Sequence, residues 1–157
     1  VTSTGIGFDL GVLYTFNPQI TFSFVMADLN SKYKWDTSPI YSTDGITSVN
    51  LFPTTKKIGT AVRFPDIDLV TTAEFVFDSY ASRILKIGAE YNLIENLFLR
   101  GGIDNWFLNN KDNSIRPSFG LSYTQKISSL YVGFEYAFVL EKYSPSDRHF
   151  IGLNINF

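Results

Sequence analysis

The sequence predicts an all-β fold, specifically an antiparallel transmembrane β-barrel in which residues 1–157 form a single domain. Three observations lead to this prediction. Apolar residues alternate with small or polar residues through most of the chain, which is the period of a strand and not of a helix. The alternating segments are about 9–12 residues long, a length that crosses a bilayer when the strand is tilted. Aromatic residues make up 17% of the chain, and membrane barrels carry girdles of them.

The composition excludes several functional classes. The 157 residues include 13 Lys and Arg, 15 Asp and Glu and no Cys, which gives a formal net charge of −2. A near-neutral chain without a basic block is not expected to bind nucleic acid. The absence of Cys excludes disulfide frameworks, thiolate zinc sites and Cys nucleophiles. No apolar run reaches about 18 residues, so the sequence predicts no transmembrane helix.

The alternation predicts about nine strands. In chain order, they are expected at residues 5–16, 20–29, 56–64, 68–78, 84–93, 96–106, 115–124, 130–141 and 147–157. The pattern is clearest in the segments that begin at residues 84, 115, 130 and 147. In the third of these, Phe134 and Phe138 share one face, while Glu135 and Ala137 share the other. The remaining segments alternate more weakly.

The connections between these strands are expected to alternate in length. Short turns are predicted near Asn17-Pro18, Pro65-Asp66, Glu95-Asn96 and Ser128-Ser129, and longer connections at about 30–55, 79–83, 107–113 and 141–147. Bacterial outer-membrane barrels have short periplasmic turns and longer outer loops. The sequence therefore predicts a location in the bacterial outer membrane, with the short turns in the periplasm.

Aromatic residues recur where the strands approach the short turns. Rings at headgroup depth form the girdles of membrane barrels, because one end of such a ring is apolar and the other polar. The predicted periplasmic girdle consists of Phe16, Phe64, Tyr91, Tyr123 and Phe157.

The face opposite the apolar residues combines glycines with sparse charges, and it lacks the dense charged coat of a soluble exterior. We expect this face to line the barrel lumen. Its charged residues are Lys57, Arg63, Glu74, Lys86, Glu90, Arg100, Asp104, Arg116 and Glu135. They could form a selectivity lining, but a network of cross-strand ion pairs is the favoured interpretation.

The segment 30–55 is the strongest candidate for contact with a partner or a ligand. It is far longer than a turn requires, and long connections in compact domains are often functional. It carries four aromatic residues that suit such contacts, namely Tyr33, Trp35, Tyr41 and Phe52. The alternative is a self-packed loop that caps the barrel mouth.

A catalytic function is not expected. His149 follows Ser144, Ser146 and Asp147, and Ser, His and Asp together can form a hydrolytic triad. His149 falls on the apolar face, however, which favours a histidine at the membrane boundary. Asp66 and Asp68 flank a turn and are expected to shape it and not to bind a metal. The sequence therefore predicts no enzyme, no cofactor and no metal site.

Several short segments resemble the FadL-like outer-membrane proteins, particularly their PorV/PorQ branch. They include Asp9-Leu10-Gly11-Val12-Leu13-Tyr14, Ala27-Asp28-Leu29-Asn30, Lys34-Trp35-Asp36-Thr37 and the closing stretch from His149 to Phe157. The resemblance implies a barrel of about 14 strands, an even number as in other single-chain bacterial barrels, of which this chain would be the C-terminal portion. It also implies transport or type IX protein secretion across the outer membrane. The implied partners are outer-membrane lipid, the remaining N-terminal strands of the same barrel, and either secretion-complex proteins or a hydrophobic solute.

Two alternatives to a secretion role stay open. One is the passage of a hydrophobic, fatty-acid-like solute, and the other is a soluble, lipocalin-like ligand-binding barrel, which also buries one face of every strand. About nine strands out of 14 would leave an open, curved sheet. We therefore expect the first strand, 5–16, not to pair with the last, 147–157.

Overall fold

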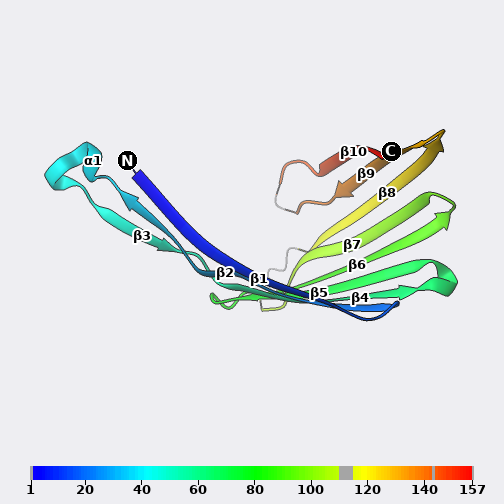
Figure 1. Ribbon diagram of the computed structural model, residues 1–157, viewed down its shortest axis with the longest axis horizontal. Helices are drawn as coiled ribbons and strands as arrows, with labels where there is room; N and C mark the ends of the chain where they lie inside the picture. The colour runs from blue at the N-terminus through cyan, green and yellow to red at the C-terminus, as the bar shows by residue number, and fades with distance from the viewer. Residues whose placement is uncertain (1, 110–114, 143, 157) are drawn as a thin grey trace.

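The computed structural model describes residues 2–109, 115–142 and 144–156, and these residues form one antiparallel sheet of ten strands (Figure 1). The strands are β1 (Thr2–Asn17), β2 (Ile20–Asp36), β3 (Thr47–Leu51), β4 (Thr55–Phe64), β5 (Leu69–Asp78), β6 (Arg83–Ile94), β7 (Leu97–Phe107), β8 (Arg116–Ile127), β9 (Leu130–Val139) and β10 (Arg148–Asn156). Three short helical turns accompany them: α1 (Ser38–Tyr41), η1 (Ser42–Asp44) and η2 (Pro65–Ile67). The predicted all-β class is confirmed.

The strands follow one another in space as they do in sequence. The order is β1-β2-β4-β5-β6-β7-β8-β9-β10, and β3 pairs only with β2. Within the described residues the sheet does not close: β1 and β10 are its two edges and do not pair with each other, as expected. No helix in the described part of the chain has the length and apolar character needed to cross a membrane.

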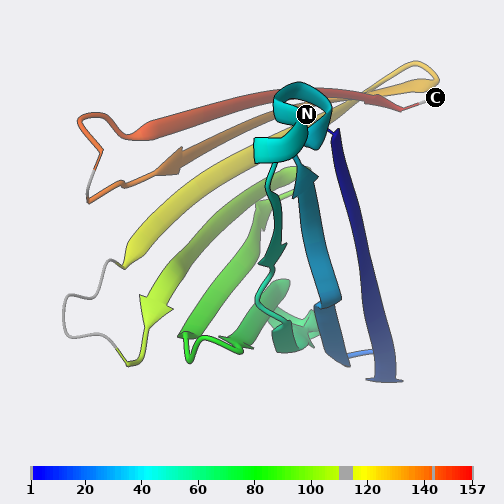
Figure 2. The same ribbon diagram turned by 90° about the vertical axis from the view of Figure 1, so that its left-hand side faces the viewer.

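The sheet is strongly curved. In Figure 1 both the N-terminal strands and β8–β10 bend toward the same side, and Figure 2 shows β8–β10 curling over the hollow of the sheet. Side chains alternate between the two faces along each strand. In β6, Lys86 and Glu90 lie on the concave face, where they pair with Glu74 and Arg100, and alternation turns Ile87 and Tyr91 toward the convex face.

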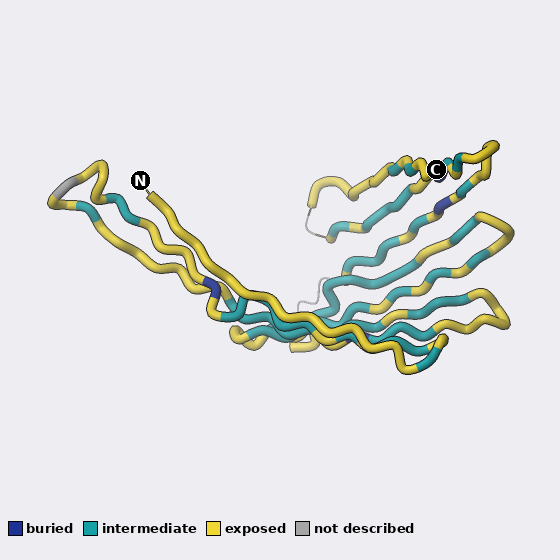
Figure 3. The backbone as a smooth tube through the Cα atoms, in the orientation of Figure 1, coloured by how far each residue is buried: buried dark blue, intermediate teal, exposed yellow. Residues whose placement is uncertain are grey.

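The large apolar side chains are not gathered into a core. No hydrophobic residue in the described part of the chain is buried, and Figure 3 shows exposed and intermediate backbone along nearly every strand. On the convex face Ile151 and Leu153 are 76% and 70% exposed. A soluble domain with this many large apolar side chains would normally bury many of them.

Two ends of the sheet are distinguished by their connections. At one, the turn end, adjacent strands are connected by Pro18-Gln19, by residues 65–68, and by Glu95-Asn96 and Ser128-Ser129. At the other, the arm end, connections span residues 37–54, 108–115 and 140–147. The expected long connection at 79–83 is wrong, because β5 and β6 are joined by only residues 79–82. This turn is tight since Asp78 Oδ1 accepts hydrogen bonds from the Tyr80 and Ser82 amides, at 2.8 and 3.0 Å.

The predicted loop 30–55 is largely a strand pair. β2 continues to Asp36, its residues Lys32–Asp36 pair on one side with Thr2–Ile6, and on the other side they pair with β3. We call these three segments, with α1 and η1, the arm. In Figure 1 the arm projects beyond the ends of the neighbouring strands. Strand β3 was not predicted from the sequence, because this short strand depends on pairing with β2.

The arm bends away from the rest of the sheet at two bulges in β2. Asp28 and Asn30 adopt left-handed backbone conformations, with φ of 57° and 53°, and the β1–β2 register shifts beside them. Asp and Asn tolerate this conformation better than other non-glycine residues. The Asp28 amide donates to Asp9 Oδ1 at 2.8 Å, and the Phe52 amide donates to the Ser31 carbonyl at 3.0 Å. These contacts fix the direction of the arm.

Close approach of β1 to β2 at the bend requires glycine at residue 7. A Cβ at Gly7 would lie 2.3 Å from Ser31 Oγ, whereas a Cβ at Gly101 would meet nothing within 4 Å. We predict that Gly7→Ala destabilises the arm by about 1–3 kcal/mol, the usual cost of overpacking, and that Gly101→Ala changes stability by less than about 0.5 kcal/mol. Hydrogen exchange of the arm amides measures the effect.

The double variant Gly7→Ala with Ser31→Gly serves as the rescue, because it removes the atoms that the new methyl group meets. Slow exchange of the arm amides is expected to return in the double variant. Equal exchange in Gly7→Ala and the parent protein would contradict the predicted clash.

Candidate functional site: a charged groove and an aromatic arm

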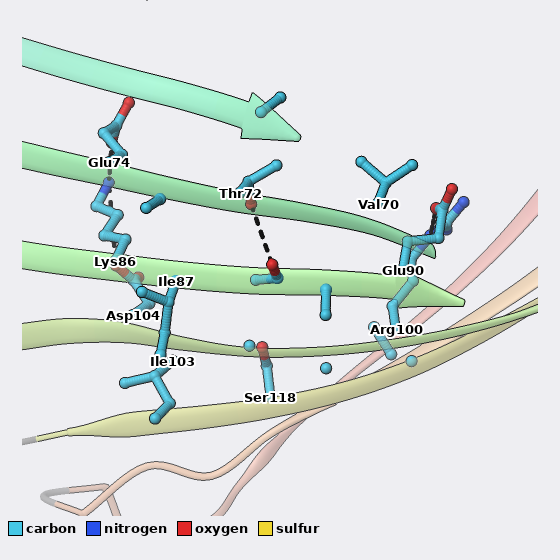
Figure 4. A pocket seen from close by; sticks show the side chains of 18 of the residues that line it. Val70, Thr72, Glu74, Lys86, Ile87, Glu90, Arg100, Ile103, Asp104 and Ser118 are labelled. Atoms are coloured by element: carbon cyan, nitrogen blue, oxygen red, sulfur yellow. Dashed lines mark hydrogen bonds and ion pairs between the residues drawn. The ribbon is translucent and has the colours of Figure 1, made fainter. Parts of the chain in front are cut away.

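A groove of about 890 Å³ runs along the concave face. Its floor is a row of small residues contributed by neighbouring strands, including Ala61, Thr72, Gly88, Gly102 and Ser118. Figure 4 labels Thr72 and Ser118 of this row. The pairing registers place these residues side by side across β4 to β8. Charged side chains rise from the strands on both sides of this floor, toward the arm end and toward the turn end.

The first set of charges, which we call the upper ladder, lies on the arm side of the floor. Its ion pairs are Glu74–Lys86 at 3.1 Å, Lys86–Asp104 at 3.9 Å, Asp104–Arg116 at 2.6 Å and Arg116–Glu141 at 3.4 Å, followed by Glu141–Arg148. Negative and positive charges alternate from β5 to β10. Because each internal member has an opposite charge on both sides, the ladder is electrically balanced along its length.

The second set, the lower ladder, lies on the turn side of the floor. Glu90 and Arg100 face each other across β6 and β7, with 2.6 Å between Oε2 and Nε. Arg100 also reaches Glu135 at 3.9 Å, and Asn154 Nδ2 donates to Glu135 Oε1 at 3.4 Å. The ladder therefore links β6, β7, β9 and β10.

The two ladders contain seven of the nine charged residues that strand alternation assigned to the inner face. The other two, Lys57 and Arg63 on β4, have no ion-pair partner within the described residues. Glu141 and Arg148 were not predicted as ladder members, although the predicted strands 130–141 and 147–157 include them; β9 ends at Val139, so Glu141 lies just beyond the strand. The sequence feature that could have indicated this pair is a negative and a positive residue on the two sides of the β9–β10 connection.

The aromatic residues of segment 30–55 gather on one face of the arm. The Tyr33 and Trp35 rings stack at 5.4 Å, and Phe52 meets Tyr33 edge-on at 6.2 Å. Tyr33 and Trp35 are each 39% exposed and Phe52 is 46% exposed, so the rings pack on one another without being covered. Tyr41 lies in α1 at the tip of the arm. The arm thus presents a preformed aromatic surface made by Tyr33, Trp35 and Phe52, which we call the aromatic cluster.

Phe16, Phe64, Tyr91 and Tyr123 are all exposed near the turn end, where the sequence predicts a girdle. Phe157, the fifth member, lies outside the described residues. A second aromatic group, which was not predicted from the sequence, lies near the arm end on the convex face and includes Phe75, Phe77 and Trp106. Phe75 and Phe77 share one face of β5, but only the β5–β6 and β6–β7 registers bring Trp106 to the level of Phe75.

His149 packs among aromatic side chains of the convex face. Its Nδ1 lies 2.8 Å from the Tyr136 hydroxyl, and its ring lies 5.0 Å from that of Phe138. Asp147 accepts a hydrogen bond from the Glu141 amide at 2.9 Å and so helps to shape the last connection. Across the described ranges, no three His, Asp or Glu side chains come together as metal ligands would.

The fold and these faces define a class of structure: an open antiparallel meander with an apolar convex face and a charged concave face. The chain matches no protein-family model and no curated protein sequence. Its function is therefore inferred from the distribution of charge, apolar surface and unpaired strand edges.

Proposed function

We propose that this chain forms part of the wall of a bacterial outer-membrane β-barrel of the FadL/PorV type, with a non-enzymatic role in protein secretion or transport. The observation that carries the proposal is the polarity of the sheet. Large apolar side chains lie exposed on the convex face, and the ion-paired charges lie on the concave face. A lipocalin-like soluble barrel would have the opposite polarity, with its apolar residues inside.

Lipid is the covering that best suits the convex face. Contiguous exposed apolar patches beyond a few hundred Å² are rare on soluble monomers, because water does not solvate them favourably. In a bilayer the same side chains would contact hydrocarbon, and the ion-paired charges would face the lumen. This arrangement is the reverse of a soluble fold and is usual for membrane barrels.

The two edge strands support a larger closed barrel. Unpaired backbone groups cost several kcal/mol each in hydrocarbon, so neither β1 nor β10 can remain a bare edge there. Both strands run from the arm end to the turn end. A fully antiparallel closure therefore requires an odd number of further strands between them. We propose these strands as the first partner of this sheet.

Between the two roles, protein secretion is the better supported. The charges that border the groove are largely paired with one another, and the aromatic cluster on the arm is preformed and half-exposed. Aromatic residues are enriched where proteins bind one another most strongly. Passage of a hydrophobic solute is the second candidate, favoured by the small residues of the groove floor, which leave room between the ladders.

The two tryptophans allow a direct test of membrane insertion. Trp106 lies on the convex face opposite Leu85, whereas Trp35 lies on the arm. In vesicles that contain brominated lipid, a variant keeping only Trp106 (Trp35→Phe) should lose much of its fluorescence. A variant keeping only Trp35 (Trp106→Phe) should keep its fluorescence. Absence of quenching in both variants would overturn the membrane proposal.

The aromatic cluster gives a test of the secretion role. We predict that the double variant Tyr33→Ser with Trp35→Ser lowers severalfold the amount of protein that the host cell secretes. The reason is that hot-spot aromatic residues each contribute about 2 kcal/mol or more to an interface. The amount of barrel in the outer membrane should stay unchanged. Tyr41→Ser, at the tip of the arm, is the matched control. Unchanged secretion in the double variant would favour solute transport.

A further inference from the structure

Two cations interrupt the apolar convex face at the arm end of the sheet. Lys56 on β4 and Arg83 on β6 both lie opposite Phe77 on β5, one on each side. Lys56 Nζ lies 6.0 Å from the centre of the Phe77 ring. Because adjacent strands are about 4.8 Å apart, the two cationic residues are separated by about 10 Å across the sheet.

No carboxylate on this face neutralises the pair within the described residues. At the level of Lys56 and Arg83 the registers place Met26 and Phe77, and the next level down holds Ile58, Phe75, Leu85 and Trp106. Asp78 follows Phe77 on the strand, but alternation turns it to the other face and its Oδ1 accepts two amide hydrogen bonds. In the same part of the chain neither Lys56 nor Arg83 has an ion-pair partner, in contrast to the cations of the two ladders.

The depth of the pair corresponds to a membrane boundary. Lys56 and the girdle residue Phe64 are eight residues apart on β4, about 26 Å along an extended strand and about 20 Å along the membrane normal for a usual barrel tilt. The apolar band of membrane barrels is about 25 Å tall. With Phe64 at one boundary, Lys56 and Arg83 lie close to the other, where lipid headgroups begin.

We propose that Lys56, Arg83 and Phe77 form a binding site for the phosphate group of a lipid headgroup at the arm-end surface of the membrane. The inference rests on the proposed function, since it requires the convex face to contact lipid. Arg and Lys form charge-assisted hydrogen bonds to phosphate oxygens, and these bonds are about twice as strong as neutral ones. The Phe77 ring between them lies against the acyl chains, so that one lipid molecule satisfies both the cations and the ring.

The test uses the full chain in detergent micelles containing rising fractions of phosphatidic acid, with Trp106 emission as the readout in the Trp35→Phe background. The parent protein should respond, because Trp106 lies one level below the cation pair. Lys56→Gln with Arg83→Gln should need at least about tenfold more phosphatidic acid for the same response, as expected for the loss of two charge-assisted bonds. An equal response in this variant and the parent overturns the proposal.

Lys126 provides a matched control. It also lies over an aromatic ring, Tyr131 at 5.4 Å, but near the turn end. Lys126→Gln should leave the response within about twofold of the parent, because a screened surface charge at that distance contributes little. A loss as large as that of the double variant would show a nonspecific charge effect and overturn the proposed site.

Two further measurements distinguish a lipid headgroup site from a free-anion site and from membrane insertion alone. Inorganic phosphate should not compete with phosphatidic acid, and equal competition would show a site for free anions and overturn the lipid assignment. Brominated-lipid quenching of Trp106, measured without anionic lipid, reports insertion alone. If brominated lipid quenches Trp106 but the protein does not respond to phosphatidic acid, the headgroup site is overturned. The proposed membrane function is not contradicted by that result.

Discussion

Ile87→Arg should prevent the chain from inserting into a bilayer, whereas Thr72→Arg should insert almost as well as the parent protein. Ile87 is on the convex face of β6, 39% exposed, and lies midway between Arg83 and Tyr91, which mark the two proposed membrane boundaries. An Arg on the lipid face of a barrel costs about 2–4 kcal/mol near the membrane midplane. That cost lowers the inserted population by a factor of about 30 or more.

Thr72 provides the control on the concave face. It is exposed in the groove, its neighbours across the sheet are Ala61 and Gly88, and Glu74 and Glu90 lie nearby to receive the new positive charge. Insertion is measured by protease protection and by retarded migration of the folded form in electrophoresis. If Ile87→Arg inserts normally, the convex face does not contact lipid, since an exposed residue of a soluble domain tolerates such a change within about 0.5 kcal/mol.

Arg116→Met is expected to destabilise the sheet by about 2–3 kcal/mol. Arg116 is the central cation of the upper ladder and contacts Asp104 at 2.6 Å and Glu141 at 3.4 Å, with its side chain only 25% exposed. Its removal leaves Asp104 with only the longer Lys86 pair and Glu141 with only Arg148. Breaking a buried pair by removing one partner costs about 3–5 kcal/mol, and partial exposure of this pair lowers the expected cost.

Lys57→Met is the matched control, because Lys57 shares the concave face but has no ion pair among the described residues. Its expected effect is within about 0.5 kcal/mol. Denaturant unfolding in micelles measures both variants. Adding Asp104→Asn to Arg116→Met should recover part of the loss, since a neutral amide needs no cation, and a purely additive double variant would argue against coupling in the ladder.

Strand alternation was sufficient to predict most of the sheet. In β6 the sequence Leu85, Ile87, Ala89 opposite Lys86, Gly88 and Glu90 places the strand within one residue of its observed bounds. It did not predict β3, whose alternation extends over only Val49 and Leu51, and whose formation depends on pairing with a β2 that continues past two bulges. The sequence around Asp28 and Asn30 does not by itself predict a left-handed backbone at these residues. The arm therefore could not be predicted without the strand pairing.

For the site, alternation predicted the face of each charge but not its partner. The partner depends on register, and a bulge at Asn105, with φ of 62°, shifts β7 so that Lys86 meets Asp104. Alternation also overestimates the solvent exposure of some side chains on the concave face. Alternation places Ser122 on the concave side, yet it is only 4% exposed, because Phe98 and Glu135 are its neighbours on the adjacent strands.

The sequential order of the sheet has a consequence for how it is assembled. Because neighbouring strands are also neighbours in sequence, most pairings are local, and topologies of this kind reach their native contacts quickly for β-proteins. The upper ladder follows the same order, from Glu74 on β5 through Lys86, Asp104 and Arg116 to Glu141 and Arg148. As the hairpins dock one after another, each arriving charge meets the opposite charge of the strand before it. With docking in this order, the net charge of the ladder alternates between −1 and zero as members are added, so charge does not accumulate along the growing edge.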